Sequence, residues 1–119
     1  MRFGLIGLGQ MGRHHARILS ESDEVEFVGA VDPMGDRHRA MRRGDIFDDV
    51  ESLLRAGIEA AVVAVPTAQH HELALQLADA NVNMLIEKPL AENVEAGLEI
   101  REQHTFILET VHHGCFRHF

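Results

Sequence analysis

A glycine-rich turn directly after an apolar run constrains this chain more than any other feature. Residues 3–6 are typical of a short buried strand. Gly7, Gly9 and Gly12 follow at a Gly-x-Gly-x-x-Gly spacing, and a helix-like pattern begins at Arg13. A strand, a tight glycine turn and a helix start together cradle a dinucleotide pyrophosphate, because the helix N-terminus offers N–H donors and the positive end of its dipole. A turn that binds nothing is the structural alternative, and the motif alone leaves both readings open.

An acidic residue stands at the end of the next apolar run. Val25–Val31 predicts a second strand, and Asp32 follows it, 20 residues beyond Gly12. That offset is typical of a carboxylate that accepts hydrogen bonds from ribose hydroxyls and repels a 2′-phosphate, which favours NAD over NADP. Arg37 favours the opposite, because a nearby arginine accommodates that phosphate. The first candidate cofactor-binding residues are therefore Asp32 and the turn residues Gly7, Leu8, Gly9, Gln10, Met11 and Gly12.

Composition excludes several classes of function. A chain of 119 residues is the length of one domain, and its net charge of −8 disfavours nucleic acids and anionic membrane surfaces as partners. No apolar run approaches the roughly 20 residues of a membrane span, and the N-terminus has no signal-peptide pattern. Cys115 is the one cysteine, which suits a reducing compartment. We therefore expect a soluble, cytoplasmic protein.

Strand and helix patterns alternate along the chain. Because parallel strands need crossover connections, this order predicts an α/β fold: a doubly wound parallel sheet of about six strands with helices on both faces. The expected helix caps are Asp48 or Asp49, Thr67 and Asn93. A left-handed conformation is expected at Asn81. The expected strands are 3–6, 25–31, 45–47, 60–65, 83–86 and 105–111, and the expected helices include 11–19, 34–43, 49–55 and 93–103.

Four chemically distinctive segments follow predicted strands. They are Gly7–Gly12, Asp32, Pro66–Thr67 and Glu87–Pro89. Ligands of an open α/β sheet bind at the carboxyl ends of its strands, so these segments are expected to meet at one edge of the sheet and to form a single site there.

The order of these motifs is more specific than any one of them. The glycine turn, His15-Ala16, Val31-Asp32, Val65-Pro66-Thr67, His70 and Glu87-Lys88-Pro89-Leu90-Ala91 follow one another. Over residues 1 to about 103, this series resembles the N-terminal half of the Gfo/Idh/MocA oxidoreductases, which include inositol and sugar dehydrogenases. The resemblance implies a Rossmann domain that binds NAD or NADP.

The resemblance also implies roles for individual residues. Lys88 would be the catalytic residue, contacting the substrate hydroxyl and assisting proton movement. Pro66 and Thr67 would border the cofactor, and Glu87 would lie beside it and orient Lys88. His15 and His70 also match family positions, where we interpret them as packing or capping residues rather than catalysts.

The end of the chain departs from the family pattern. Family members continue into a second domain that supplies most substrate contacts, so we expect residues 1–119 to be one dinucleotide-binding domain with an atypical tail at 104–119. Such a truncated chain would not be catalytically complete, and a sugar or polyol would be its substrate only if a second domain were supplied. The alternative is a non-enzymatic cofactor-sensing or protein-interaction module, which could self-associate through exposed apolar surface. The tail residues His112, His113, Cys115 and His118 match no closed zinc pattern, so no metal site is expected.

Overall fold

The strands form one sheet. The computed structural model of the chain describes residues 1–103, 107–110 and 116–118. Within these residues the sheet has seven strands in the order β3-β2-β1-β4-β5-β6-β7, and every neighbouring pair is parallel except β6 with β7. The strands are β1 (Arg2–Ile6), β2 (Glu26–Val31), β3 (Asp45–Phe47), β4 (Ala60–Val63), β5 (Asn83–Ile86), β6 (Ile107–Thr110) and β7 (Phe116–His118).

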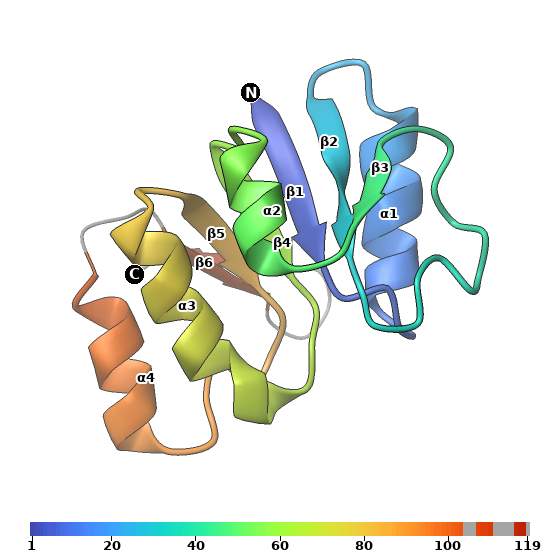
Figure 1. The fold of residues 1–119 in the computed structure, drawn as a ribbon. Helices are drawn as coiled ribbons and strands as arrows, with labels where there is room; N and C mark the ends of the chain where they lie inside the picture. The colour runs from blue at the N-terminus through green and yellow to red at the C-terminus, as the bar shows by residue number, and fades with distance from the viewer. Residues whose placement is uncertain (104–106, 111–115, 119) are drawn as a thin grey trace.

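Helices cover both faces of the sheet. α1 (Gly12–Glu21) packs on one face through Ala16 and Leu19, which lie in a cluster with Leu5, Ala30 and Val62. The opposite face carries α2 (Val50–Arg55), α3 (His70–Asp79) and α4 (Val94–Arg101), which bury Leu53, Leu77 and Ile100 against Ile6, Val63 and Ile86. Figure 1 shows these three helices in front of the sheet and α1 behind it.

The predicted doubly wound sheet is confirmed. β1 lies between β2 and β4, so the chain extends the sheet first in one direction and then in the other. The six predicted strands are present, with shorter bounds at several ends. The antiparallel strand β7 is an addition that the sequence did not predict. The reversal of strand order beside β1 is where ligands of such sheets bind.

The helix predicted over 34–43 is wrong. This stretch is a loop in which Gly35 and Arg39 have positive φ angles, of 62° and 51°, which no right-handed helix contains. The Asp36 carboxylate accepts hydrogen bonds from the N–H groups of Ala40 and Met41, each at 2.9 Å. A short acidic side chain that binds nearby backbone competes in this way with helix formation.

Two of the three predicted helix caps are confirmed. Asp49 accepts from Ser52 N at 2.7 Å at the start of α2, and Asn93 accepts from Ala96 N at 2.8 Å at the start of α4. The hydrogen bonds from Ser52 hold the pKa of Asp49 below its ordinary value. The prediction for Thr67 is wrong, because Thr67 begins a short 3₁₀ turn (η1, Thr67–Gln69), and α3 starts after it without a side-chain cap. Asn81 adopts the predicted left-handed conformation, with φ of 56°.

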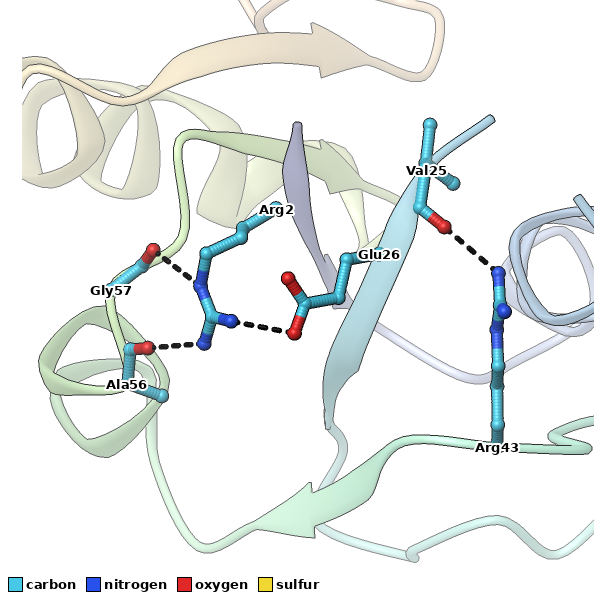
Figure 2. A network of polar contacts seen from close by, with 6 residues as sticks. All are labelled: Arg2, Val25, Glu26, Arg43, Ala56 and Gly57. Atoms are coloured by element: carbon cyan, nitrogen blue, oxygen red, sulfur yellow. Dashed lines mark hydrogen bonds and ion pairs between the residues drawn. The ribbon is translucent and has the colours of Figure 1, made fainter. Parts of the chain in front are cut away.

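An arginine joins three elements at the amino ends of the strands. Arg2 of β1 donates to Ala56 O at 2.7 Å and Gly57 O at 3.1 Å, just after α2, and to Glu26 Oε1 of β2 at 2.6 Å. Figure 2 shows its guanidinium between these three partners. In the same view Arg43 donates to Val25 O at 2.9 Å, which holds the end of the 33–44 loop against the start of β2.

Replacing Arg2 tests this contribution to stability. We expect Arg2→Met to lower the free energy of unfolding by about 1–2 kcal/mol, because two carbonyl groups lose a charged donor. Glu26→Gln is the matched variant, and its cost should stay below about 1 kcal/mol because the Arg2–Glu26 ion pair is solvent-exposed. Urea unfolding measures both values. Equal losses in the two variants would mean that the ion pair, not the carbonyl contacts, stabilises this edge.

Candidate functional site

The glycine turn lies where β1, β4 and α1 meet. Gly7 has a φ of 101°, and a Cβ at this position would lie 2.3 Å from Ala64 O. A Cβ on Gly12 would lie 1.9 Å from Gly7 O, so both positions require glycine for close backbone packing. Above Gly9 the space is open, since the nearest atom to a Cβ there is Arg37 Nη2 at 4.0 Å. The open position is the one over which a ligand can approach the backbone.

The start of α1 suits an anion. Its N-cap residue Met11 makes no side-chain capping hydrogen bond, and its first turn contains no acidic residue. The starts of α2 and α4 differ, because Asp49 and Asn93 cap them. The first N–H groups of a helix need acceptors, and a phosphate is a suitable one. The donors at this turn therefore fit the pyrophosphate of a dinucleotide.

Asp32 links the end of β2 to the glycine turn. Its Oδ2 accepts from Leu8 N at 2.8 Å, and its Oδ1 accepts from Met34 N at 2.7 Å. Each carboxylate oxygen has a second lone pair, so these contacts leave Asp32 able to accept from a ligand hydroxyl as well. The carboxylate is half-buried and faces the hollow that contains the turn.

Two adjoining hollows lie at the carboxyl ends of the strands. The first hollow, of about 440 Å³, is lined by Gly7, Gly9, Asp32, Arg37, Val65 and Pro66 among others. The second hollow, of about 490 Å³, is lined by Gly9, Gln10, Met11, Pro66, Glu87 and Lys88 among others. Gly9 and Pro66 line both, so the two hollows form one continuous surface with Asp32 at one end and Lys88 at the other.

The predicted site residues reach this surface in different ways. Seven of them, together with Lys88, line a hollow: Gly7, Gly9, Gln10, Met11, Asp32, Pro66 and Glu87. Leu8 is 1% exposed, so its side chain belongs to the core and only its backbone N–H serves the turn. Gly12 acts through its missing side chain, and Thr67 lines neither hollow.

Sequence reasoning missed what two histidines do. His15 Nε2 donates to Glu87 Oε1 at 2.5 Å, so the ring joins α1 to the end of β5. His70 is 1% exposed, and its Nδ1 lies 2.9 Å from Pro89 O while its Nε2 lies 2.9 Å from Val65 O. Carbonyl oxygens only accept, so a ring nitrogen of His70 forms a hydrogen bond here only where it carries the proton. The sequence signal was that both histidines match family positions in the same series of motifs as Glu87-Lys88-Pro89.

Two further predictions concern features beyond this surface. Among the described residues, no group of three or more His, Cys, Asp or Glu side chains is arranged to hold a metal ion. His112, His113 and Cys115 of the tail lie outside the described residues. In the part of the chain that the structure covers, every helix is too short or too polar to cross a lipid bilayer.

Comparison with known proteins places the sequence in one group. The family model for Gfo/Idh/MocA, described as an oxidoreductase family with an NAD-binding Rossmann fold, matches residues 1–104. The chain is 36% identical to inositol 2-dehydrogenase 1 of Saccharopolyspora erythraea, over 84% of this chain and 32% of that protein. It is 34% identical to glucose-6-phosphate 3-dehydrogenase of Bacillus subtilis, over 79% of this chain and 27% of that protein.

Solved structures agree with this grouping. The structure of a dehydrogenase (MviM) from Clostridium difficile superimposes with a TM-score of 0.82 at 28% identity, covering 92% of this chain and 38% of that one. The chain thus spans about a third of the length of the relatives that it matches.

Two glycine variants test the packing at the turn. We expect Gly7→Ala to lower the free energy of unfolding by about 3 kcal/mol or more, because a strained φ angle and a clash with the Ala64 carbonyl add together. Gly35→Ala is the control, since Gly35 also has a positive φ angle but open space around it, and it should cost only about 1–2 kcal/mol. Thermal and urea unfolding compare the two. Similar losses would show that conformation alone, without close approach, requires Gly7.

Proposed function

The chain belongs to the Gfo/Idh/MocA oxidoreductase family, and from this premise we propose that residues 1–103 are the NAD(H)-binding domain of a sugar or polyol dehydrogenase. The observation that carries the proposal is the hydrogen bond from Leu8 N to Asp32 Oδ2, at 2.8 Å. It brings the glycine turn and the Asp32 carboxylate to the same hollow, where the turn would bind the phosphates and Asp32 the ribose of one dinucleotide.

The first hollow is proposed to hold the adenosine half of the cofactor. The N–H groups of Gly9, Gln10 and Met11 would meet the pyrophosphate, and Asp32 would accept from the ribose hydroxyls. Pro66 forms part of the wall on the β4 side.

We propose NAD rather than NADP as the cofactor. A 2′-phosphate would lie against the Asp32 carboxylate, and like charges at that distance repel. Arg37 lines the same hollow and is exposed, so it is the residue that would moderate this preference. The balance between Asp32 and Arg37 therefore sets the discrimination between the two dinucleotides.

The second hollow is proposed to receive the nicotinamide half. When bound, the nicotinamide ring would supply the hydride acceptor or donor. Lys88 lines this hollow beside Gln10 and Met11, where its ammonium group would hydrogen-bond the substrate hydroxyl and take part in moving its proton. Glu87 is 8% exposed, and its carboxylate lies at the inner wall of the hollow.

The substrate class rests on the relatives. Two that match act, by their names, on inositol and on glucose 6-phosphate, and each is about three times the length of this chain. A sugar or polyol would approach Lys88 from the open side of the second hollow, and residues outside these 119 would supply the remaining contacts.

Calorimetric titration of the purified chain with NAD and with NADP tests the proposal. We expect NAD to bind at least about tenfold more tightly, since charged hydrogen bonds to the ribose are each worth about 1.5–3 kcal/mol. Asp32→Asn should reduce this preference by about tenfold or more, because the amide neither repels a phosphate nor accepts two hydroxyls equally well.

Asp36→Asn is the matched control for the Asp32 variant. Asp36 also accepts two backbone N–H groups in the 33–44 loop but does not line the first hollow. It should change the affinities for NAD and NADP by the same factor. No binding of either dinucleotide by the wild-type chain would refute the proposed function. Tighter binding of NADP would overturn only the role of Asp32.

A chimera tests the role of Lys88. Residues 1–104 would replace the matching segment of the inositol 2-dehydrogenase from Saccharopolyspora erythraea, and reduction of NAD by myo-inositol would be followed. We expect Lys88→Met to lower kcat by about 10²–10⁴-fold, the usual size of a proton-transfer contribution, with the affinity for NAD unchanged. Arg101→Met, on the far end of α4, is the control and should leave kcat within about twofold. A Lys88→Met chimera with full activity would remove Lys88 from the reaction.

A further inference from the structure

We propose that His15 and His70 are positioning residues for Lys88, which they hold from opposite sides through the segment Glu87–Leu90. This inference rests on the proposed function, because it assigns to the two histidines the placement of the lysine that would act there. Both rings contact residues immediately next to Lys88 in the chain, and the two come from different helices.

His15 holds the side of the segment that precedes Lys88. Its Nε2 donates to Glu87 Oε1 at 2.5 Å, and both side chains are largely buried, at 19% and 11% exposure. The backbone of Glu87 is also fixed, since its N–H donates to Val63 O at 2.9 Å and continues the pairing of β5 with β4. The residue before Lys88 is therefore held by both its backbone and its side chain.

His70 holds the side that follows Lys88. Its Nδ1 lies 2.9 Å from Pro89 O and 3.2 Å from Leu90 O, and its Nε2 lies 2.9 Å from Val65 O. Leu90 packs into the core cluster and is 9% exposed, which anchors the far end of the segment. One buried ring thus connects the turn after Lys88 to Val65, which lies two residues beyond β4 and lines both hollows.

Lys88 itself is exposed between these two fixed points. It has a long, flexible side chain, and such a chain reaches a defined place only if its backbone is held. His15 also belongs to α1, whose N-terminus would meet the cofactor phosphates, so the same contact relates the position of Lys88 to the position of the bound dinucleotide.

The sequence offers an unusually direct probe, because Lys88 is the only lysine in the chain. Reductive methylation with ¹³C-formaldehyde labels Lys88 and the N-terminal amine, which gives two methyl signals in an NMR spectrum. Met1 lies at the amino end of β1, at the edge opposite the hollows, and serves as the internal reference. In the wild type we expect saturating NADH to shift the Lys88 signal and to leave the Met1 signal in place.

Four variants separate positioning from general stabilisation. His15→Leu should at least halve the NADH-induced shift of the Lys88 signal, whereas His15→Gln keeps a donor near Nε2 and should retain most of it. At His70 the contacts of the two ring nitrogens can be tested one at a time. His70→Asn keeps a donor near Nδ1 for Pro89 and should retain the shift, and His70→Gln keeps one near Nε2 for Val65 and should lose at least half.

His14→Gln and His71→Gln are the matched controls. Each lies one residue from a proposed positioning histidine on the same helix: His14 is exposed, and His71 pairs with Glu99 at 2.9 Å. Both should keep the wild-type shift. If His15→Leu does not fold, the comparison of His70→Asn with His70→Gln still decides the matter, because each retains one buried amide.

The outcomes distinguish this inference from the proposed function. Equal shifts in His70→Asn and His70→Gln, together with a wild-type shift in the His15 variants, would overturn the positioning role while leaving cofactor binding intact. A wild-type chain that binds no NADH would overturn the proposed function. The positioning role would then be tested in the spectra without cofactor. It stands only if the chemical shift of the Lys88 signal in His15→Leu and in His70→Gln differs from that in the wild type.

Discussion

Close backbone packing at Gly7 is the constraint on which the rest of the structure depends. The carboxyl end of β1, the residue after β4 and the first turn of α1 meet there, at separations that leave no room for a Cβ on Gly7 or Gly12. The Gly7 N–H also donates to Val31 O at 2.8 Å, so the end of β2 is bonded to the same point. Because these four elements converge without intervening side chains, a ligand could approach backbone N–H groups at the centre of the sheet edge.

The polar groups around this point serve the fold and the proposed chemistry at the same time. Asp32 accepts from two backbone N–H groups, so the carboxylate proposed to bind the ribose also holds the turn proposed to bind the phosphates. His15 and Glu87 form the corresponding link on the other side of the turn. Cofactor selectivity and the shape of the site are therefore coupled, and a variant at Asp32 is informative only beside a control such as Asp36.

Local chemistry explains which parts of the fold could be predicted. The caps Asp49 and Asn93 and the left-handed Asn81 act within a few residues of themselves, and all three were predicted correctly. The 33–44 loop was mistaken for a helix because the Asp36 carboxylate binds backbone N–H groups within it. Distant contacts add to this, since Arg42 N donates to Ser20 Oγ and Arg43 donates to Leu19 O, both on α1. Thr67 was mistaken for a cap because Pro66 and the 3₁₀ turn delay the start of α3 to His70.

The sequence by itself determined the order of the first six strands, the glycine turn and the edge at which the site residues gather. Periodicity, glycine spacing and parallel connectivity are properties of consecutive residues, so they can be read without coordinates. Only the tertiary structure decided which side chains meet across that edge. His15 and Glu87 are 72 positions apart, and His70 reaches Pro89 over 19, so these contacts depend on how α1 and α3 pack against the sheet. Packing of that kind is a property of the whole core, and no local pattern encodes it.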